Sequence, residues 1–182
     1  MKVYNFSPGP AKLDSSIISK SQEAMYNFQN TGLSILEIGH RSKEFEKLMN
    51  SLQENIRNIF NVPTNYFTLF LQGGATFQNT FIANNFDKRD KDLGCLVTGT
   101  WGKNTFDDFS KIRETKLIEL SQDQIENFVE SGEDLKNVDY LHLTSNETIN
   151  GVQLREFNKI NHDSLLIDMS SDIGSYRFEW DN

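Results

Sequence analysis

Short apolar runs alternate with helix-like stretches from residue 66 onward, and this alternation constrains the fold more than any other feature. Helix-like stretches follow the Gly73-Gly74 pair, follow Gly102 and cover residues 123–130. The apolar runs between them have the length and composition of buried strands: 66–71, 94–98, 116–120, 138–144 and 164–168. Strand–helix–strand units join their strands in parallel and place helices on both faces of the sheet. The sequence therefore predicts an α/β fold with a mostly parallel sheet and flanking helices.

The first 60 residues have a different, helical pattern. Pro8-Gly9-Pro10 interrupts regular structure, so we expect an extended arm before the first helix. Asp14 is a suitable N-cap for a helix over residues 15–30, and Gly32 is a typical stop signal. A second helix is predicted to begin near Ser42, where apolar residues start to recur every three or four positions.

Charge and cysteine content narrow the classes of function. The formal net charge of −8 argues against a nucleic-acid or anionic-membrane partner, because both require basic patches. The single cysteine, Cys95, cannot form an internal disulfide, and its apolar neighbours favour a buried strand residue over a nucleophile. The chain has no secretory signal pattern and no apolar stretch long enough to span a membrane. We therefore expect a cytoplasmic protein.

The polar and glycine-rich segments of the chain lie where the predicted strands end. In parallel sheets, ligands bind at the carboxyl ends of the strands, so four polar strand ends predict one shared pocket. These segments are Gln72-Gly73-Gly74, Thr98-Gly99-Thr100-Trp101, Thr144-Ser145-Asn146-Glu147-Thr148 and Asp168-Met169-Ser170-Ser171-Asp172.

Two of these segments contain groups that could bind an anion and a flat ring, respectively. Gly73-Gly74-Ala75-Thr76 opens a helix, whose backbone N–H groups can bind an anion; a plain tight turn is the alternative interpretation. The lysine and hydroxyl residue that end a nucleotide P-loop are absent. Trp101, between glycines at a strand end, is either a core tryptophan or a stacking platform for a flat ring.

Charged candidates lie at two other positions. Asp168 ends an apolar strand and needs a partner there, which a protonated pyridine nitrogen would provide; a helix cap or a backbone-bonded aspartate is the alternative. The His40-Arg41 pair can bind a carboxylate or phosphate, or it is a solvated polar loop. The histidines show no metal-site spacing, and no hydrolase elbow motif is present.

Taken together, these segments resemble those of the phosphoserine aminotransferase family. The members of this family are fold type I pyridoxal-phosphate enzymes. The resemblance extends over nearly the whole chain in collinear order. Two segments separate this family from other aminotransferases: His40-Arg41-Ser42-Lys43-Glu44-Phe45 and Ser145-Asn146-Glu147-Thr148-Ile149. The further matching segments are residues 5–11, 70–75, 98–101 and 168–173.

The resemblance implies a role for each residue of the cofactor pocket. Ala75 and Thr76 would hold the phosphate of pyridoxal 5′-phosphate through their backbone. Trp101 would stack on the pyridine ring, and Thr148 would hydrogen-bond the ring hydroxyl. Asp168 would pair with the ring nitrogen.

The resemblance also implies the substrates and the assembly. The family converts glutamate and 3-phosphohydroxypyruvate into 2-oxoglutarate and phosphoserine, in serine biosynthesis. Arg41 would hold the acidic group of the substrate, and His40 would assist across the interface of a homodimer.

One element of the family pattern is expected to be missing. The family forms its internal Schiff base with a lysine that follows the Asp168 segment, but the last lysine here is Lys159. We therefore expect a truncated form that is inactive alone: an N-terminal arm at 1–14 and an incomplete cofactor-binding domain at 15–182, without the lysine strand and the C-terminal small domain. Two alternatives remain open. The chain is a non-catalytic fragment that binds a cofactor or a partner, or it is part of another fold type I enzyme.

Overall fold

The chain forms two compact units, Met1–Val62 and Pro63–Asn182. The computed structural model describes residues 3–86, 92–131, 135, 137–177 and 179–180. Within these ranges, none of the helices combines the length and the hydrophobicity needed to span a lipid bilayer.

The N-terminal unit is helical. Residues 3–14 hold no helix or strand, and α1 (Ser15–Tyr26) begins at the predicted cap, because Asp14 Oδ1 accepts a hydrogen bond of 2.8 Å from the Ser16 N–H. The helix ends before the predicted residue 30. Its C-cap residue, Asn27, adopts φ −155° and ψ 88°, a backbone conformation outside the helical region.

The second helix of this unit, α2 (Lys43–Phe60), begins where the sequence predicts. The Ser42 hydroxyl accepts a hydrogen bond of 3.2 Å from the Phe45 N–H, which caps the first turn. The helix ends at Asn61, whose φ of 50° is left-handed.

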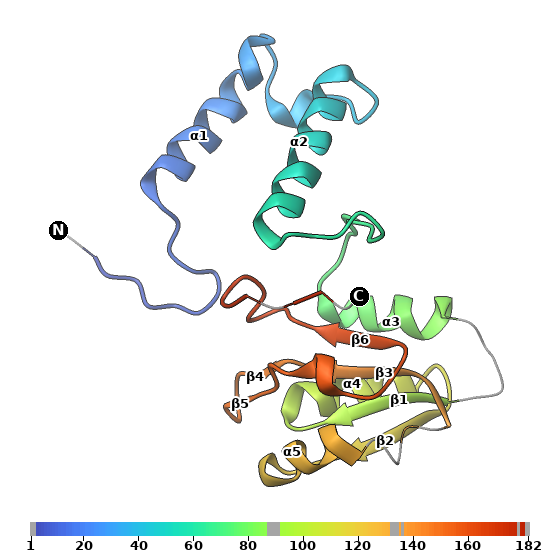
Figure 1. Cartoon of the computed structure of the whole chain (residues 1–182). Coiled ribbons are helices and arrows are strands. Elements are labelled where there is room, and N and C mark those ends of the chain that lie inside the picture. Colours follow the sequence, from blue (N-terminus) through green and yellow to red (C-terminus); the bar gives the residue numbers. More distant parts are fainter. Residues whose placement is uncertain (1–2, 87–91, 132–134, 136, 178, 181–182) are drawn as a thin grey trace. The chain divides into compact units, whose positions relative to one another are not determined.

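The C-terminal unit is built on a four-stranded parallel sheet with the strand order β2-β1-β3-β6 (Figure 1). The predicted parallel sheet is therefore confirmed. In the pairing of β3 with β6, Thr144 at the end of β3 lies beside Asp168 at the end of β6. The strands are β1 (Asp92–Val97), β2 (Thr115–Glu119), β3 (Val138–Thr144) and β6 (Leu165–Asp168).

Two apolar clusters show that both faces of this sheet are covered. One contains Cys95, Phe109 and Ala83, which come from β1, from α4 (Thr100–Ser110) and from α3 (Ala75–Asn85). The other contains Leu143, Phe128 and Leu96, which come from β3, from α5 (Gln122–Ser131) and from β1. Successive strand residues point to opposite faces, which is why one strand contributes to both clusters.

The predicted placement of Cys95 is confirmed. Its side chain is fully buried in the sheet, and burial raises the pKa of the thiol to about 12. A thiol with such a pKa holds its proton at neutral pH and is a poor nucleophile.

The prediction of a buried strand at residues 66–71 is wrong. The segment has no strand structure, and Phe67, Leu69 and Leu71 expose 90%, 71% and 63% of their surface. Apolar composition alone does not make a strand, because its backbone groups need a neighbouring strand as a partner. No described strand pairs with this segment. A short antiparallel pair that the sequence did not predict, β4 (Asn146–Glu147) and β5 (Val152–Gln153), follows β3 instead.

Candidate active site

The carboxyl ends of β3 and β6 are tied together by direct hydrogen bonds. Ser145, which follows β3, donates from its backbone N–H and from its hydroxyl to the Asp168 carbonyl oxygen, both at 3.0 Å. The Ser145 hydroxyl also lies 2.6 Å from Oδ1 of the buried Asp172. The polar segments after these two strands therefore form one edge of the sheet, as the strand-end argument predicts.

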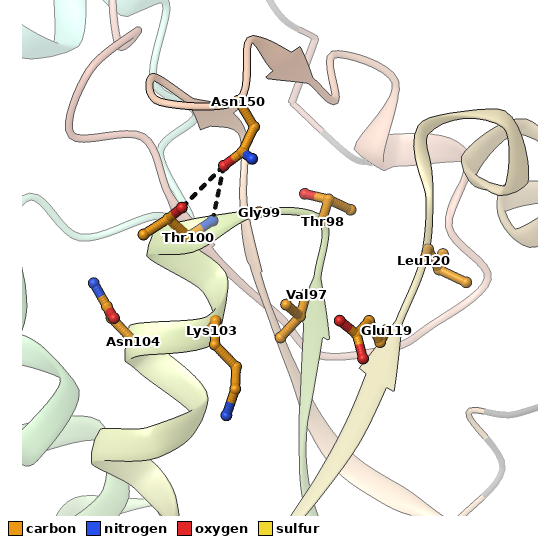
Figure 2. Close-up of a pocket in the computed structure, with 9 residues that line it drawn as sticks. All are labelled: Val97, Thr98, Gly99, Thr100, Lys103, Asn104, Glu119, Leu120 and Asn150. Carbon is orange, nitrogen blue, oxygen red and sulfur yellow. Dashed lines mark hydrogen bonds between the residues drawn. The ribbon is translucent and has the colours of Figure 1, made fainter.

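The segment after β1 is held to the same edge by the loop that begins with β4. Glu147, which is fully buried, accepts hydrogen bonds from the Trp101 and Gly102 N–H groups at 2.8 Å and 2.7 Å. Asn150 Oδ1 lies 3.0 Å from the Thr100 N–H and 3.1 Å from its hydroxyl, and Figure 2 shows both contacts. Sequence reasoning assigned no role to Glu147 or Asn150, because nothing in the sequence shows which backbone groups they meet.

Trp101 and Thr148 are direct partners. The indole Nε1–H donates a hydrogen bond of 2.8 Å to Thr148 Oγ1. The Trp101 side chain is 43% exposed, which excludes the interpretation of a core tryptophan. Because Thr148 Oγ1 accepts from the indole, the hydroxyl hydrogen of Thr148 remains available to a ligand.

Ala75 and Asp168 line the same cleft, which has a volume of about 440 Å³. It lies between α3 and the end of β6, and most of its exposed lining is apolar. The polar groups that face it include Asp168, His142 and Asn79. Asn79 also donates to Thr105 Oγ1 at 3.3 Å, which ties α3 to α4.

The Asp168 carboxylate is only half satisfied by the protein. Oδ1 accepts a hydrogen bond of 2.9 Å from the Ser170 N–H, as in an Asx turn. No hydrogen bond to Oδ2 occurs within the described part of the chain. The side chain is half-buried, so one oxygen remains available to a ligand in the cleft.

His142 is the second titratable group that lines the cleft. The residue is buried, with Cys95 Sγ 3.9 Å from Nδ1 and the Phe109 ring edge-on at a centroid distance of 5.3 Å. Burial lowers the pKa of His142 to about 4, and the Asp168 carboxylate opposes that shift only partly. The imidazole is therefore neutral at physiological pH.

The helix N-termini of α3 and α4 differ in how their first turns are capped. At α4, side chains of the β4 loop occupy the N–H groups of residues 100–102. At α3, the cap residue is Gly74, which has no side chain, and the preceding Gly73 takes a φ of 89°. Ala75 and Thr76 have no acceptor within the helix, so their N–H groups can bind an anion.

His40 and Arg41 lie in the N-terminal unit, whereas the cleft belongs to the C-terminal unit. Both residues are exposed in the turn before α2, where the Ser42 N–H donates to the Gly39 carbonyl oxygen at 2.9 Å. An exposed position leaves both side chains accessible to an anion.

A second cleft, of about 420 Å³, lies at the ends of β1 and β2 beside α4 (Figure 2). Thr98, Lys103, Glu119 and Asn150 are among its polar lining residues, and none of the residues predicted to bind the cofactor or substrate lines it. In the described ranges, no three His, Cys, Asp or Glu side chains are placed to hold a metal ion.

Comparison with known proteins places this geometry in context. The family model described as aminotransferase class-V matches residues 3–182. The phosphoserine aminotransferase of Geobacillus kaustophilus is 38% identical over an alignment of 182 positions, which covers 98% of this chain and 50% of that protein. This chain thus spans about half the length of the curated relatives that it matches.

Solved structures agree with this similarity. The phosphoserine aminotransferase from Bacillus circulans subsp. alkalophilus superimposes with a TM-score of 0.84 at 34% identity, covering 98% of this chain and 50% of that one. A PLP-bound phosphoserine aminotransferase from Trichomonas vaginalis gives a TM-score of 0.77 at 30% identity, covering 94% and 52%.

Proposed function

The chain belongs to the aminotransferase class-V family, and on that premise we propose that it supplies the cofactor-binding part of a phosphoserine aminotransferase. The proposed reaction transfers the amino group of glutamate to 3-phosphohydroxypyruvate, yielding phosphoserine and 2-oxoglutarate, in serine biosynthesis. Residues 15–182 would belong to the cofactor-binding domain and residues 1–14 to an arm, in a cytoplasmic homodimer.

The observation that carries the proposal is the joint placement of an open helix N-terminus and a half-satisfied carboxylate in one cleft. Ala75 begins α3 and lines the cleft, and Asp168 lines it from the end of β6. Pyridoxal 5′-phosphate carries a phosphate and a basic ring nitrogen, which suit these two groups. The residues present therefore fit this cofactor.

Asp168, Trp101 and Thr148 would each contact a different part of the cofactor ring. When bound, pyridoxal phosphate supplies an electron sink for the carbanion at the substrate carbon. Asp168 would keep the ring nitrogen protonated, because an adjacent carboxylate favours the charged form. The exposed indole of Trp101 would cover one face of the ring. Thr148 would donate its free hydroxyl hydrogen to the ring oxygen.

Replacing Asp168 by asparagine tests the cofactor assignment. Asparagine can still accept from the Ser170 N–H but cannot stabilise a protonated ring nitrogen. Losing one charge-assisted bond costs about 1.5–3 kcal/mol, so the dissociation constant for pyridoxamine 5′-phosphate should rise roughly 10- to 200-fold. Isothermal titration calorimetry measures this, with Asp163→Asn as the control at an exposed loop carboxylate. Equal affinity of Asp168→Asn and the unmodified protein would refute the assignment.

Arg41 and His40 would select the acidic substrates. Arg41→Ala should lower kcat/KM for 3-phosphohydroxypyruvate by roughly 10- to 200-fold, because a planar fork with two parallel bonds to an oxyanion is lost. The kcat/KM for glutamate should fall too, because the two substrates bind in turn to the same site. Arg41→Lys, which keeps the charge and loses the fork, should be intermediate.

His40→Ala should act more selectively, on the phosphorylated substrate. The measurement is kcat/KM for both half-reactions in a version of the protein that also carries the downstream lysine, with the exposed Lys43→Ala as the neighbouring-charge control. If His40→Ala affects phosphorylated and non-phosphorylated substrates equally, His40 does not bind the phosphate.

A further inference from the structure

Glu147 is an acidic side chain buried completely inside the C-terminal unit, with both carboxylate oxygens occupied. Oε2 accepts from the Trp101 N–H at 2.8 Å, and Oε1 accepts from the Gly102 N–H at 2.7 Å. An unpaired buried carboxylate is costly, so these two bonds are what allows Glu147 to lie there. The negative charge also lies at the positive end of the α4 dipole.

The glycines on either side of Thr100-Trp101 leave the space that this carboxylate fills. A Cβ atom at Gly99 would lie 2.7 Å from both Cγ and Cδ of Glu147. A Cβ atom at Gly102 would lie 3.1 Å from Oε1. Gly99 is the N-cap residue of α4 and has no side chain to cap the first turn, so Glu147 and Asn150 provide that cap from another part of the chain.

Trp101 is therefore held at two points by neighbouring residues of one loop. Glu147 binds its backbone N–H, and Thr148 binds its indole Nε1–H at 2.8 Å. The loop itself is closed by a hydrogen bond of 2.7 Å from the Gly151 N–H to the Glu147 carbonyl oxygen. A shift of Glu147 would move both contacts together, because residues 147 and 148 are adjacent.

We infer that Glu147 is a positioning residue, which sets the orientation of the Trp101 indole and of the Thr148 hydroxyl for an aromatic ligand. The inference rests on the proposed function for the identity of that ligand, a pyridoxal-type ring. Glu147 does not touch the ligand in this arrangement; it acts through the backbone of residues 101–102.

Replacing Glu147 by glutamine tests the inference, because the shape is kept while one acceptor oxygen becomes an N–H₂ donor. One buried N–H of α4 then faces a donor. In a Trp180→Phe background, the near-UV circular dichroism of Trp101 should weaken on Glu147→Gln. The dissociation constant for pyridoxamine 5′-phosphate, which needs no covalent link, should rise at least about fivefold. Glu156→Gln, at an exposed glutamate, should change neither quantity.

A double-mutant cycle separates positioning from a general structural effect. In a Trp101→Ala background, Glu147→Gln should change the affinity for pyridoxamine 5′-phosphate less than it does in the unmodified protein, because only the Thr148 hydroxyl remains to be oriented. An equal change in both backgrounds would overturn the inference, and so would an unchanged near-UV signal of Trp101. If Glu147→Gln fails to fold, Gly99→Ala serves as the second variant. Its Cβ displaces the Glu147 carboxylate without removing it, so the near-UV signal of Trp101 should weaken in this variant too.

The two hypotheses fail in different ways. If the unmodified protein does not bind pyridoxamine 5′-phosphate but Glu147→Gln still weakens the Trp101 signal, the proposed function is wrong and the positioning of the indole is supported. If the unmodified protein binds and Glu147→Gln changes neither signal nor affinity, the positioning role is wrong and the proposed function is unaffected.

Discussion

Replacing Phe109 by alanine should lower the free energy of unfolding by about 3–5 kcal/mol. The Phe109 side chain is fully buried between α4 and the sheet, in the cluster with Cys95 and Val97. Truncation removes its apolar contacts and leaves a cavity that the surrounding helix and strands can fill only in part. Urea denaturation, monitored by far-UV circular dichroism at neutral pH, measures the change.

Phe67→Ala is the matched control, because it deletes the same atoms from a side chain that is 90% exposed. Its effect should stay within about 0.5 kcal/mol. Similar losses for the two variants would contradict the assignment of Phe109 to the core.

Acidification from pH 7 to pH 4 should destabilise the protein by about 3 kcal/mol through His142 alone. Folding lowers the pKa of His142 from its ordinary 6.5 to about 4, because burial disfavours the charged imidazolium. Between these values the unfolded chain binds a proton that the folded protein excludes. The stabilisation is therefore fully present above about pH 6.5 and is lost as the pH falls toward 4.

The His142→Gln variant isolates this contribution. Carboxylates titrate over the same range in both proteins, so the difference between the two unfolding curves reports His142. The unmodified protein should lose about 3 kcal/mol more than the variant between pH 7 and pH 4. A direct NMR titration of the His142 ring gives an independent value. Equal losses in the two proteins would mean that the folded protein admits the charged imidazole.

Local signals in the sequence predicted most of the elements. Ser42 begins a helix because its hydroxyl caps the first turn, a contact made within four residues. The boundaries of β3 match the predicted run 138–144, because a mostly apolar run bounded by polar residues is typical of a buried strand. Asp14 similarly caps α1 through Ser16, two residues away.

The segment 66–71 shows that local sequence signals are not always sufficient to predict an element. Its composition favours a strand, but a strand exists only if its backbone N–H and C=O groups find partners on a neighbour. The early end of α1 was not predicted either: Asn27 already leaves the helical backbone conformation, and no strong stop residue precedes Gly32 in the sequence.

The sequence by itself determined the α/β class, the parallel strands and the edge of the sheet to which the polar segments belong. These follow from periodicity, from turn residues and from the rule that parallel strands end at one edge. Only the tertiary structure decided which side chains meet there. Glu147 lies 46 residues from Trp101 along the chain, and Ser145 lies 23 residues from Asp168. Such pairings depend on burial and on the exact approach of distant backbone groups, which no local pattern of residues encodes.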